Sequence, residues 1–436
     1  MTRSRTRSKR AWTLVLPVTI VAAAVMVSAG TTQAGPNTKG PKFSEAVAFD
    51  VSQPLSVLAK NQKPSTRTLR PVTGKDTDSE LTAEASARSV FSVIASLFAP
   101  QAAGGQTSGV PGPPPTISPT IANFEGVSNQ DNFNLFGFRV NPPDPVGDVG
   151  PNHYVEMVNL AYAVYSKTGT LLAGPIDTGA LWAGFPITDC TDPSGDPVVV
   201  YDQIADRWLL SQFTTAGPTY YECIAISVTG DPTGAYYRYP FSTGLNFPDY
   251  PKLGVWRDSY VLTTREFGPT VEYGIGVYAL ERGRMLNGKK AQAAAFFLDG
   301  NDPKILPLVG DGLLPPDLDG RRIPDQTDPA PLVGTQDDNA FYGATSDALN
   351  IWDLKVKWST SPTASLTFAA QLAVDPFNSI FPCGGNPGQT ARDCLLQPGV
   401  APTALNLLDI LSYRQRPTYR LAYRNFVTYA GMVTNQ

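Results

Sequence analysis

Short runs of aromatic and β-branched residues, separated by clusters of Gly, Pro, Asn and Asp, fill the chain from about residue 117 onward. The runs HYVEMVN at 153–159, DPVVVYDQIADRWLLSQFT at 196–214 and YPKLGVWRDSYVLTTREF at 250–267 are typical. Residues of the first kind favour strands, whereas those of the second kind favour turns. Segments with helical periodicity are scarce by comparison. The pattern therefore predicts an all-β domain over 117–436.

The spacing of these runs narrows the architecture. Analogous runs begin near residues 151, 197 and 251, roughly forty to fifty-five residues apart, which is about the length of one four-stranded propeller blade. Radial packing buries both faces of each small sheet and shields the short strand edges. A β-sandwich is the competing architecture, but two sheets usually need far fewer residues. We therefore expect a β-propeller-like fold of antiparallel four-stranded blades.

The N-terminus has the pattern of a secretory signal peptide. MTRSRTRSKR carries only positive charges, AWTLVLPVTIVAAAVMVSAG is apolar, and TTQAG places Thr32 and Ala34 where a signal peptidase needs small residues. An uncleaved anchor is the alternative, because the apolar run is nearly long enough to span a bilayer. We assign residues 1–34 to a signal peptide, with a secreted or cell-surface location and no membrane span in the mature chain.

Residues 35–116 resemble a tether more than a core. Polar, Pro-punctuated stretches such as KNQKPSTRTLRPVTGKDTDSE and GGQTSGVPGPPPTISPT show no periodic burial. One exception is the segment 79–98, whose apolar residues follow helical spacing after Ser79. We predict a mostly disordered tether with a short helix in that segment.

Four cysteines allow three pairings: Cys190, Cys223, Cys383 and Cys394. Pairing each with its nearer neighbour is the simplest arrangement, and disulfides are expected in an exported protein. Zinc is the alternative, but the chain has no CxxC spacing and a single histidine, His153.

The charge balance argues against nucleic acid as a partner. Lys and Arg number 34 against 38 Asp and Glu, for a formal net charge of −4, so no basic excess is available for phosphates. Gly 38 and Pro 40 are abundant, which suits many short strands joined by tight turns.

The stretch DPVGDVGPNHYVEMVN at 144–159 offers oxygen ligands. Asp144 and Asp148, together with backbone carbonyls, are candidates for a Ca²⁺ site. The structural alternative is an entry turn to a strand, in which the two aspartates bond nearby N–H groups and the glycines allow positive φ. His153 alone is a poor basis for Ser-His-Asp chemistry, and GxSxG is absent.

A glycoside hydrolase would need two positioned carboxyl groups. The candidates at strand starts, which would face one rim, are Asp148, Asp196, Asp249 and Glu266. Aspartate before a proline at a strand start also serves turns, so the catalytic residues remain unknown. A hydrolase should bring at least two of the four within ~5–10 Å around a pocket.

PPDPVGDVGPNHYVEMVN, DPVVVYDQIADRWLLSQF, DYPKLGVW and YRLAYRNF, in this order, resemble a group of large secreted bacterial proteins thought to fold as β-propellers. The resemblance covers nearly all of the chain after residue 34. It implies location and architecture, and no catalytic residues carry over. Such proteins continue well past the YRLAYRNF phrase, so the resemblance implies a C-terminally truncated form with an incomplete ring and an unpaired sheet edge.

The expected function is extracellular binding or a surface-associated scaffold without catalysis. The ligand would be a polysaccharide or a surface protein. The alternative is a carbohydrate-active hydrolase with paired carboxylates at the central mouth of the propeller. No cofactor is expected apart from the Ca²⁺ considered above.

Overall fold

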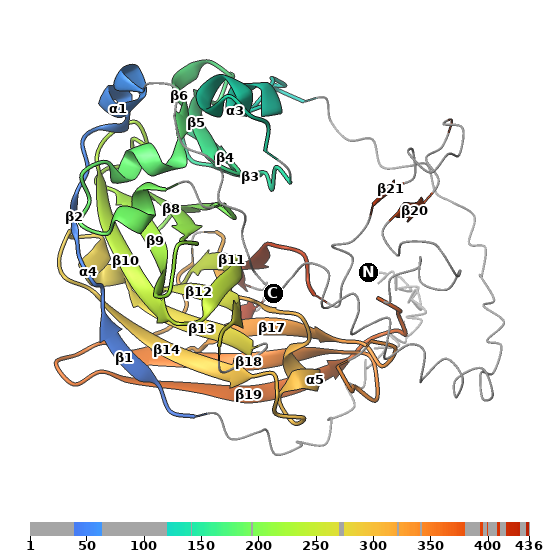
Figure 1. Cartoon of the computed structure of the whole chain (residues 1–436). Coiled ribbons are helices and arrows are strands. Elements are labelled where there is room, and N and C mark those ends of the chain that lie inside the picture. Colours follow the sequence, from blue (N-terminus) through green and yellow to red (C-terminus); the bar gives the residue numbers. More distant parts are fainter. Residues whose placement is uncertain are drawn as a thin grey trace, which may run out of the picture. The chain divides into compact units, whose positions relative to one another are not determined.

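A computed structural model shows a protein built mainly from antiparallel β-sheets, which confirms the predicted all-β class (Figure 1). In the described residues, four larger sheets follow one another along the chain, two with four strands and two with five. The predicted signal peptide and the predicted helix at 79–98 lie outside the described residues. The structure describes residues 39–62, 120–140, 142–192, 195–269, 274–320, 322–340, 342–379, 393–395, 399, 408–409, 416–427 and 433–435.

In each of the first three sheets, four consecutive strands form an antiparallel meander, whereas the fourth sheet combines a meander of three consecutive strands with a two-residue strand from earlier in the chain. The first sheet consists of β3 (Val146–Val149), β4 (His153–Val158), β5 (Ala161–Ser166) and β6 (Leu171–Asp177). The second consists of β7 (Val198–Asp202), β8 (Arg207–Phe213), β9 (Tyr220–Ser227) and β10 (Tyr236–Gly244), with β2 at its edge. The third consists of β11 (Phe247–Val255), β12 (Ser259–Phe267), β13 (Gly274–Glu281) and β14 (Gln292–Asp299), with β1 at its edge. The fourth consists of β15 (Leu313–Leu314), β17 (Ala330–Gln336), β18 (Ala348–Lys357) and β19 (Thr363–Ala373).

The hydrophobic core lies between successive sheets. One cluster joins the first and second sheets around Trp208, a second joins the second and third sheets around Tyr260, and a third joins the third and fourth sheets around Trp352. All three side chains are fully buried. The aromatic residues predicted to pack the sheets therefore do so at these positions.

The first strands of successive sheets are neighbours. β3 lies beside β7, β7 beside β11, and β11 beside β16 (Pro316–Leu318), a short strand next to the fourth sheet. Two aspartates connect them, since Asp148 accepts the N–H of Tyr201 at 2.8 Å and Asp317 accepts the N–H of Val255 at 3.0 Å. The described residues do not form a closed ring of sheets.

Residues 39–62 form a belt along the outer edges of the sheets. β1 (Lys42–Glu45) extends the third sheet beside β14, β2 (Asp50–Val51) extends the second beside β10, and α1 (Leu55–Asn61) contacts β6 of the first (Figure 1). Leu55 is fully buried in the core between the first two sheets. This corrects the prediction of a tether for residues 39–62, because backbone pairing at free sheet edges orders a segment that has little core of its own.

Arg238 fixes the belt to the second sheet. Its guanidinium is 4% exposed and bonds both carboxylate oxygens of Asp50, at 2.7 and 2.6 Å. It also donates to the carbonyl oxygens of Leu181 and Ala183, in the segment after the first sheet. A bidentate, half-buried ion pair of this kind holds a defined geometry.

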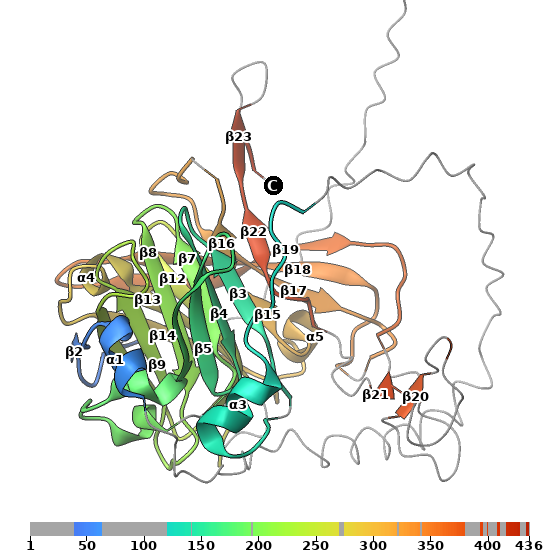
Figure 2. The same ribbon diagram turned by 90° about the horizontal axis from the view of Figure 1, so that it is seen from above.

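The C-terminal region adds smaller two-stranded sheets. β22 (Leu421–Tyr423) pairs in parallel with β16, beside which it lies in Figure 2. Within the described residues, neither β22 nor β23 belongs to a four-stranded sheet. The remaining strands are β20 (Asp393–Leu395), β21 (Leu408–Asp409), β23 (Asn425–Val427) and β24 (Val433–Asn435). The remaining helices are α3 (Asn129–Phe136), α4 (Arg282–Met285), α5 (Leu306–Val309), η1 (Thr178–Trp182) and η2 (Thr188–Thr191).

Cys190 and Cys223 form a disulfide between η2 and β9, with an S–S distance of 1.94 Å and both residues fully buried. This confirms the predicted nearest-neighbour pairing for these two cysteines. The second predicted disulfide would join Cys383 to Cys394. Cys394 is in β20, but Cys383 lies outside the described residues. In the part of the chain that the structure describes, no helix has the length and apolar character needed to cross a membrane.

Candidate functional site

An aspartate lies at or near the start of the first strand of each of the four sheets. Asp144, Asp196 and Asp311 each stand two residues before β3, β7 and β15, and Asp249 is the third residue of β11. Asp144 and Asp196 have positive φ (39° and 44°), as does Tyr250 (52°), and each of these three residues precedes a proline. Aspartate tolerates this backbone region better than most residues, which explains its repeated use here. We call these four aspartates and Lys252, Arg265 and Arg416 the acidic rim.

One part of the acidic rim joins the first and second sheets. The amide of Asn159 donates to Asp144 at 2.7 Å, and its oxygen accepts the N–H of Asp196 at 2.8 Å. Burial raises the pKa of Asp196 to about 6, and the neighbouring charge of Asp144 adds to the rise. The pKa of Lys252 is lowered to about 8 by burial. Both groups therefore change protonation close to neutral pH.

The other part of the acidic rim joins the third and fourth sheets. Arg265 is 1% exposed and lies 2.8 Å from a carboxylate oxygen of Asp311 and 3.7 Å from one of Asp249. Arg416, from the C-terminal region, lies 3.6 Å from the other oxygen of Asp311. The ring of Tyr250 connects the two parts, with the Lys252 ammonium 3.4 Å and the Arg416 guanidinium carbon 3.8 Å from its centroid.

Two buried glutamates lie behind the acidic rim, between the second and third sheets. Glu266 in β12 accepts hydrogen bonds from Asn246 (2.9 Å), Thr264 (3.2 Å) and the hydroxyl of Tyr278. Glu222 in β9 is 0% exposed, and neither of its carboxyl oxygens has a hydrogen-bond partner in the described part of the chain. Burial raises the pKa of both glutamates, that of Glu222 most strongly. Burial therefore favours the neutral form of Glu222.

The structure brings three of the four predicted carboxylates to one end of the sheets. Asp196 and Asp249 belong to the acidic rim, and Glu266 lies behind it. Asp148 does not join them, because it lies at the far end of β3, about 13 Å along the strand from Asp144. The prediction that all four face one rim is therefore wrong for Asp148.

At the end of β3 opposite the acidic rim, Arg420 lies close to three carboxylates from different parts of the chain. Its guanidinium nitrogens lie 3.6 Å from Asp148, 3.3 Å from Asp317 and 3.7 Å from Asp319. Burial raises the pKa of Asp317 to about 7 and also raises that of Asp148. Arg420 therefore anchors the C-terminal region to the sheets.

The same separation counts against calcium binding through Asp144 and Asp148 together. Asp144 bonds Asn159, whereas Asp148 accepts the N–H groups of Val149 and Tyr201. Among the described residues, one cluster of three acidic side chains has carboxylate oxygens within 4.8 Å of one another. It consists of Asp337, Asp338 and Asp347. The carboxylates of Asp337 and Asp347 accept backbone N–H groups from neighbouring loops, which accounts for their position.

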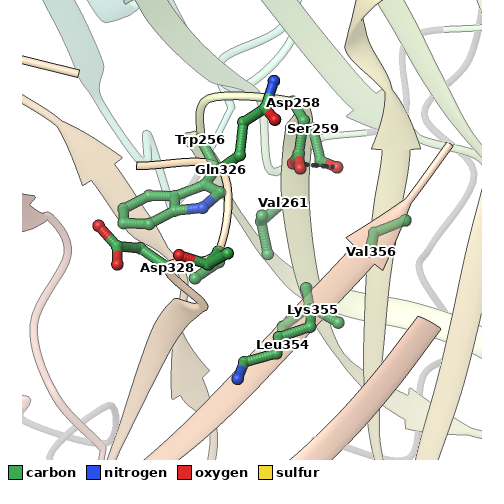
Figure 3. Close-up of a pocket in the computed structure, with 11 residues that line it drawn as sticks. Trp256, Asp258, Ser259, Val261, Gln326, Asp328, Leu354, Lys355 and Val356 are labelled. Atoms are coloured by element: carbon green, nitrogen blue, oxygen red, sulfur yellow. Dashed lines mark hydrogen bonds between the residues drawn. The ribbon is translucent and has the colours of Figure 1, made fainter. Parts of the chain in front are cut away.

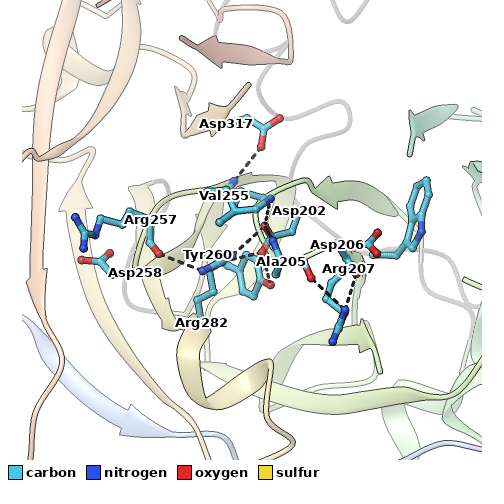
Figure 4. A network of polar contacts seen from close by, with 12 residues as sticks. Asp202, Ala205, Asp206, Arg207, Val255, Arg257, Asp258, Tyr260, Arg282 and Asp317 are labelled. Carbon is cyan, nitrogen blue, oxygen red and sulfur yellow. Dashed lines mark hydrogen bonds and ion pairs between the residues drawn. The ribbon is translucent and has the colours of Figure 1, made fainter. Parts of the chain in front are cut away.

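Asp202, at the far end of β7, is the centre of a buried network between the second and third sheets (Figure 4). One oxygen accepts the N–H groups of Ile204 and Ala205, and Arg282 bonds both oxygens, at 2.7 and 3.0 Å. The hydroxyl of Tyr260 donates to Asp202 at 2.9 Å. No sequence signal pointed to this network, because Arg282 comes from α4, about eighty residues along the chain from Asp202.

Comparisons with protein-family models, with curated proteins and with solved structures found no match. The resemblance to secreted propeller-like proteins therefore stays a prediction. Glu222 was also missed from the sequence, although it is the one charged residue in the otherwise largely apolar strand YYECIAIS.

Proposed function

We propose that the protein is an exported binding protein of propeller type, whose four sheets are blades and whose extracellular ligand binds at the acidic rim. The propeller arrangement is supported by the order of the sheets, of which the first three each contain a meander of four consecutive strands, and by the contacts of β3 with β7 and of β7 with β11. Export is supported by the basic and apolar pattern of residues 1–34 and by the Cys190–Cys223 disulfide.

The acidic rim is the observation that carries the binding proposal. Strand starts from all four sheets present aspartates beside Lys252, Arg416 and the ring of Tyr250. Carboxylates accept hydrogen bonds from hydroxyl and amino groups, whereas the cations donate to oxygens. A site with both kinds of group suits a polar ligand, and we favour a polysaccharide.

A hydrolase is the second candidate, favoured by the different environments of the carboxyl groups at this end of the sheets. Burial raises the pKa of Glu222 and so favours the protonated form that a general acid needs, whereas Asp249 lies 3.7 Å from the guanidinium of Arg265. Pairs of carboxyl groups whose environments separate their pKa values perform glycoside hydrolysis. Glu222 is fully buried, however, so this reaction would require an opening between the second and third sheets.

A glycan screen for binding and turnover on the full-length protein tests both candidates. For a binding protein, we expect affinity without turnover, and a loss of about tenfold or more in the Asp196→Asn and Lys252→Met variants. Asp206→Asn is the matched control, since Asp206 is exposed at the opposite end of β7. Turnover that disappears in Glu222→Gln would establish the hydrolase instead. Ligand binding that neither rim variant weakens would refute the role of the acidic rim.

A further inference from the structure

A cavity of about 290 Å³ lies between the third and fourth sheets, far from the acidic rim (Figure 3). Its walls include Trp256, in the turn after β11, whereas the rim residue Asp249 is close to the start of that strand. At about 3.3 Å per residue, Asp249 and Trp256 are about 20 Å apart along β11. Val261 and Leu354 are buried and form an apolar floor, and the indole of Trp256 lies beside them.

Polar groups surround this floor. Asp258 and Asp328 are half-buried, and Gln326 and Lys355 are exposed at the edge. One oxygen of Asp258 accepts the hydroxyl of Ser259 at 2.9 Å, and its other oxygen makes no side-chain hydrogen bond among the described residues. One oxygen of Asp328 accepts the N–H of Asp325 at 2.8 Å, and the other has no hydrogen bond in the described part. The cavity thus offers a free acceptor on Asp328 and a second, half-buried carboxylate on Asp258.

The balance of these groups restricts the ligand. An anion would meet two carboxylates, and a ligand with several positive charges would meet the ammonium of Lys355. A purely apolar ligand would displace water from these carboxylates without replacing the hydrogen bonds that the water makes, which is costly. A neutral ligand with many hydroxyl groups can donate to Asp258 and Asp328 and accept from Lys355 and Gln326. Its C–H surface can lie against Val261 and Leu354.

We propose that this cavity binds one neutral sugar unit, either a free monosaccharide or the end of a glycan. The volume is at the lower end of the range for ligand pockets and suits one ring better than several. The exposed edge at Gln326 and Lys355 leaves room for a glycan to continue into solvent. This site is separate from the acidic rim and does not require that the rim bind anything.

Saturation-transfer NMR and calorimetry on the full-length protein test this proposal, with glucose, galactose, mannose and N-acetylglucosamine as probes. Each probe is used both as the free sugar and as the end unit of an oligosaccharide. Comparing the two affinities shows whether the cavity prefers a free monosaccharide or the end of a glycan. We expect at least one probe to bind, and Asp328→Asn and Lys355→Met each to weaken it about tenfold, the effect of losing a hydrogen bond to a charged group. Asp325→Asn, in the same loop, and Lys357→Met, on the same strand, should change affinity less than about twofold.

Two outcomes would overturn the proposal. One is that no probe binds to the folded protein. The other is that sugar binding is unchanged in Asp328→Asn and Lys355→Met but is lost in Lys252→Met, which would place the sugar at the acidic rim and leave the proposed function intact. Asp328 is only half-buried, Lys355 is exposed, and neither forms an ion pair among the described residues, so both variants should fold, as circular dichroism would verify.

Discussion

Asp202 and Glu222 are equally buried, yet their surroundings differ completely. Both are 0% exposed, both lie on the second sheet, and both face the third sheet, at opposite ends of the strands. Asp202 accepts five hydrogen bonds, two of them from Arg282. Glu222 accepts none within the described residues, and burial raises its pKa well above the ordinary value. Burial alone therefore does not decide whether a carboxyl group keeps its charge; its partners do.

The comparison separates a structural role from a chemical one. At the end of the sheets around Asp202, the polar atoms of its carboxylate are saturated, so the network holds two sheets together and has little capacity left for a ligand. At the end around Glu222, the acidic rim contains groups that titrate near neutral pH, namely Asp196 and Lys252. Such perturbed groups are more often found at functional sites.

The largest effect should come from Asp202→Asn. Removal of this charge leaves the guanidinium of Arg282, which is 8% exposed, without its counter-ion, and we expect the free energy of unfolding to fall by about 3–5 kcal/mol. Urea denaturation measures the change. The control is Asp206→Asn, because Asp206 is exposed and four residues further along the chain. This variant should lower the free energy of unfolding by less than about 1 kcal/mol. If the two variants lowered the free energy of unfolding equally, the buried network around Asp202 would contribute no more to stability than an exposed aspartate.

A smaller loss should follow from Tyr260→Phe. This variant removes one hydrogen bond to Asp202 and keeps the buried ring, so we expect a loss of about 1.5 kcal/mol. Tyr162→Phe is a matched control, because the buried hydroxyl of Tyr162 has no hydrogen-bond partner among the described residues. Its removal should leave stability unchanged or raise it. The same denaturation experiment measures both variants, and a reversed order would contradict the assigned hydrogen bonds.

The smallest effect, and one of opposite sign, should come from Glu222→Gln. Because the pKa of Glu222 is higher in the folded than in the unfolded protein, the folded state binds more protons above about pH 4.5, so this group lowers stability as pH rises. The variant lacks this dependence. We expect equal melting temperatures near pH 4 and a higher one for the variant at pH 7. Exposed Glu125→Gln should follow the wild type throughout. A variant with the wild-type pH profile would mean that Glu222 has a partner and is charged.

The strands were predictable because their signals are local. The apolar and aromatic runs at 153–159, 196–214 and 250–267 contain β4, β8 and β12, and the nearest-neighbour pairing of Cys190 with Cys223 was confirmed. The belt was missed, because β1 has four residues and β2 two, too few for alternation to be visible. Their order comes from pairing with β14 and β10, which no local pattern encodes.

The candidate site was predictable only in part. Of the four carboxyl groups chosen because they stand near predicted strand starts, Asp196 and Asp249 lie in the rim. Asp148 lies at the other end of β3, because a position near a predicted strand start does not reveal which end of the sheet a side chain reaches. Glu222 and Arg282 were missed because their importance depends on what faces them from another strand or sheet.

The belt has a consequence for how the molecule assembles. β1 and β2 are made first, yet the strands that they pair with, β14 and β10, are made roughly two hundred residues later. Their contacts therefore bridge roughly two hundred residues and form only after a large loop has closed, which slows folding. Until β1 and β2 pair with them, the outermost strands of the second and third sheets can pair with other polypeptides. During folding, strands that are synthesised early must therefore dock late.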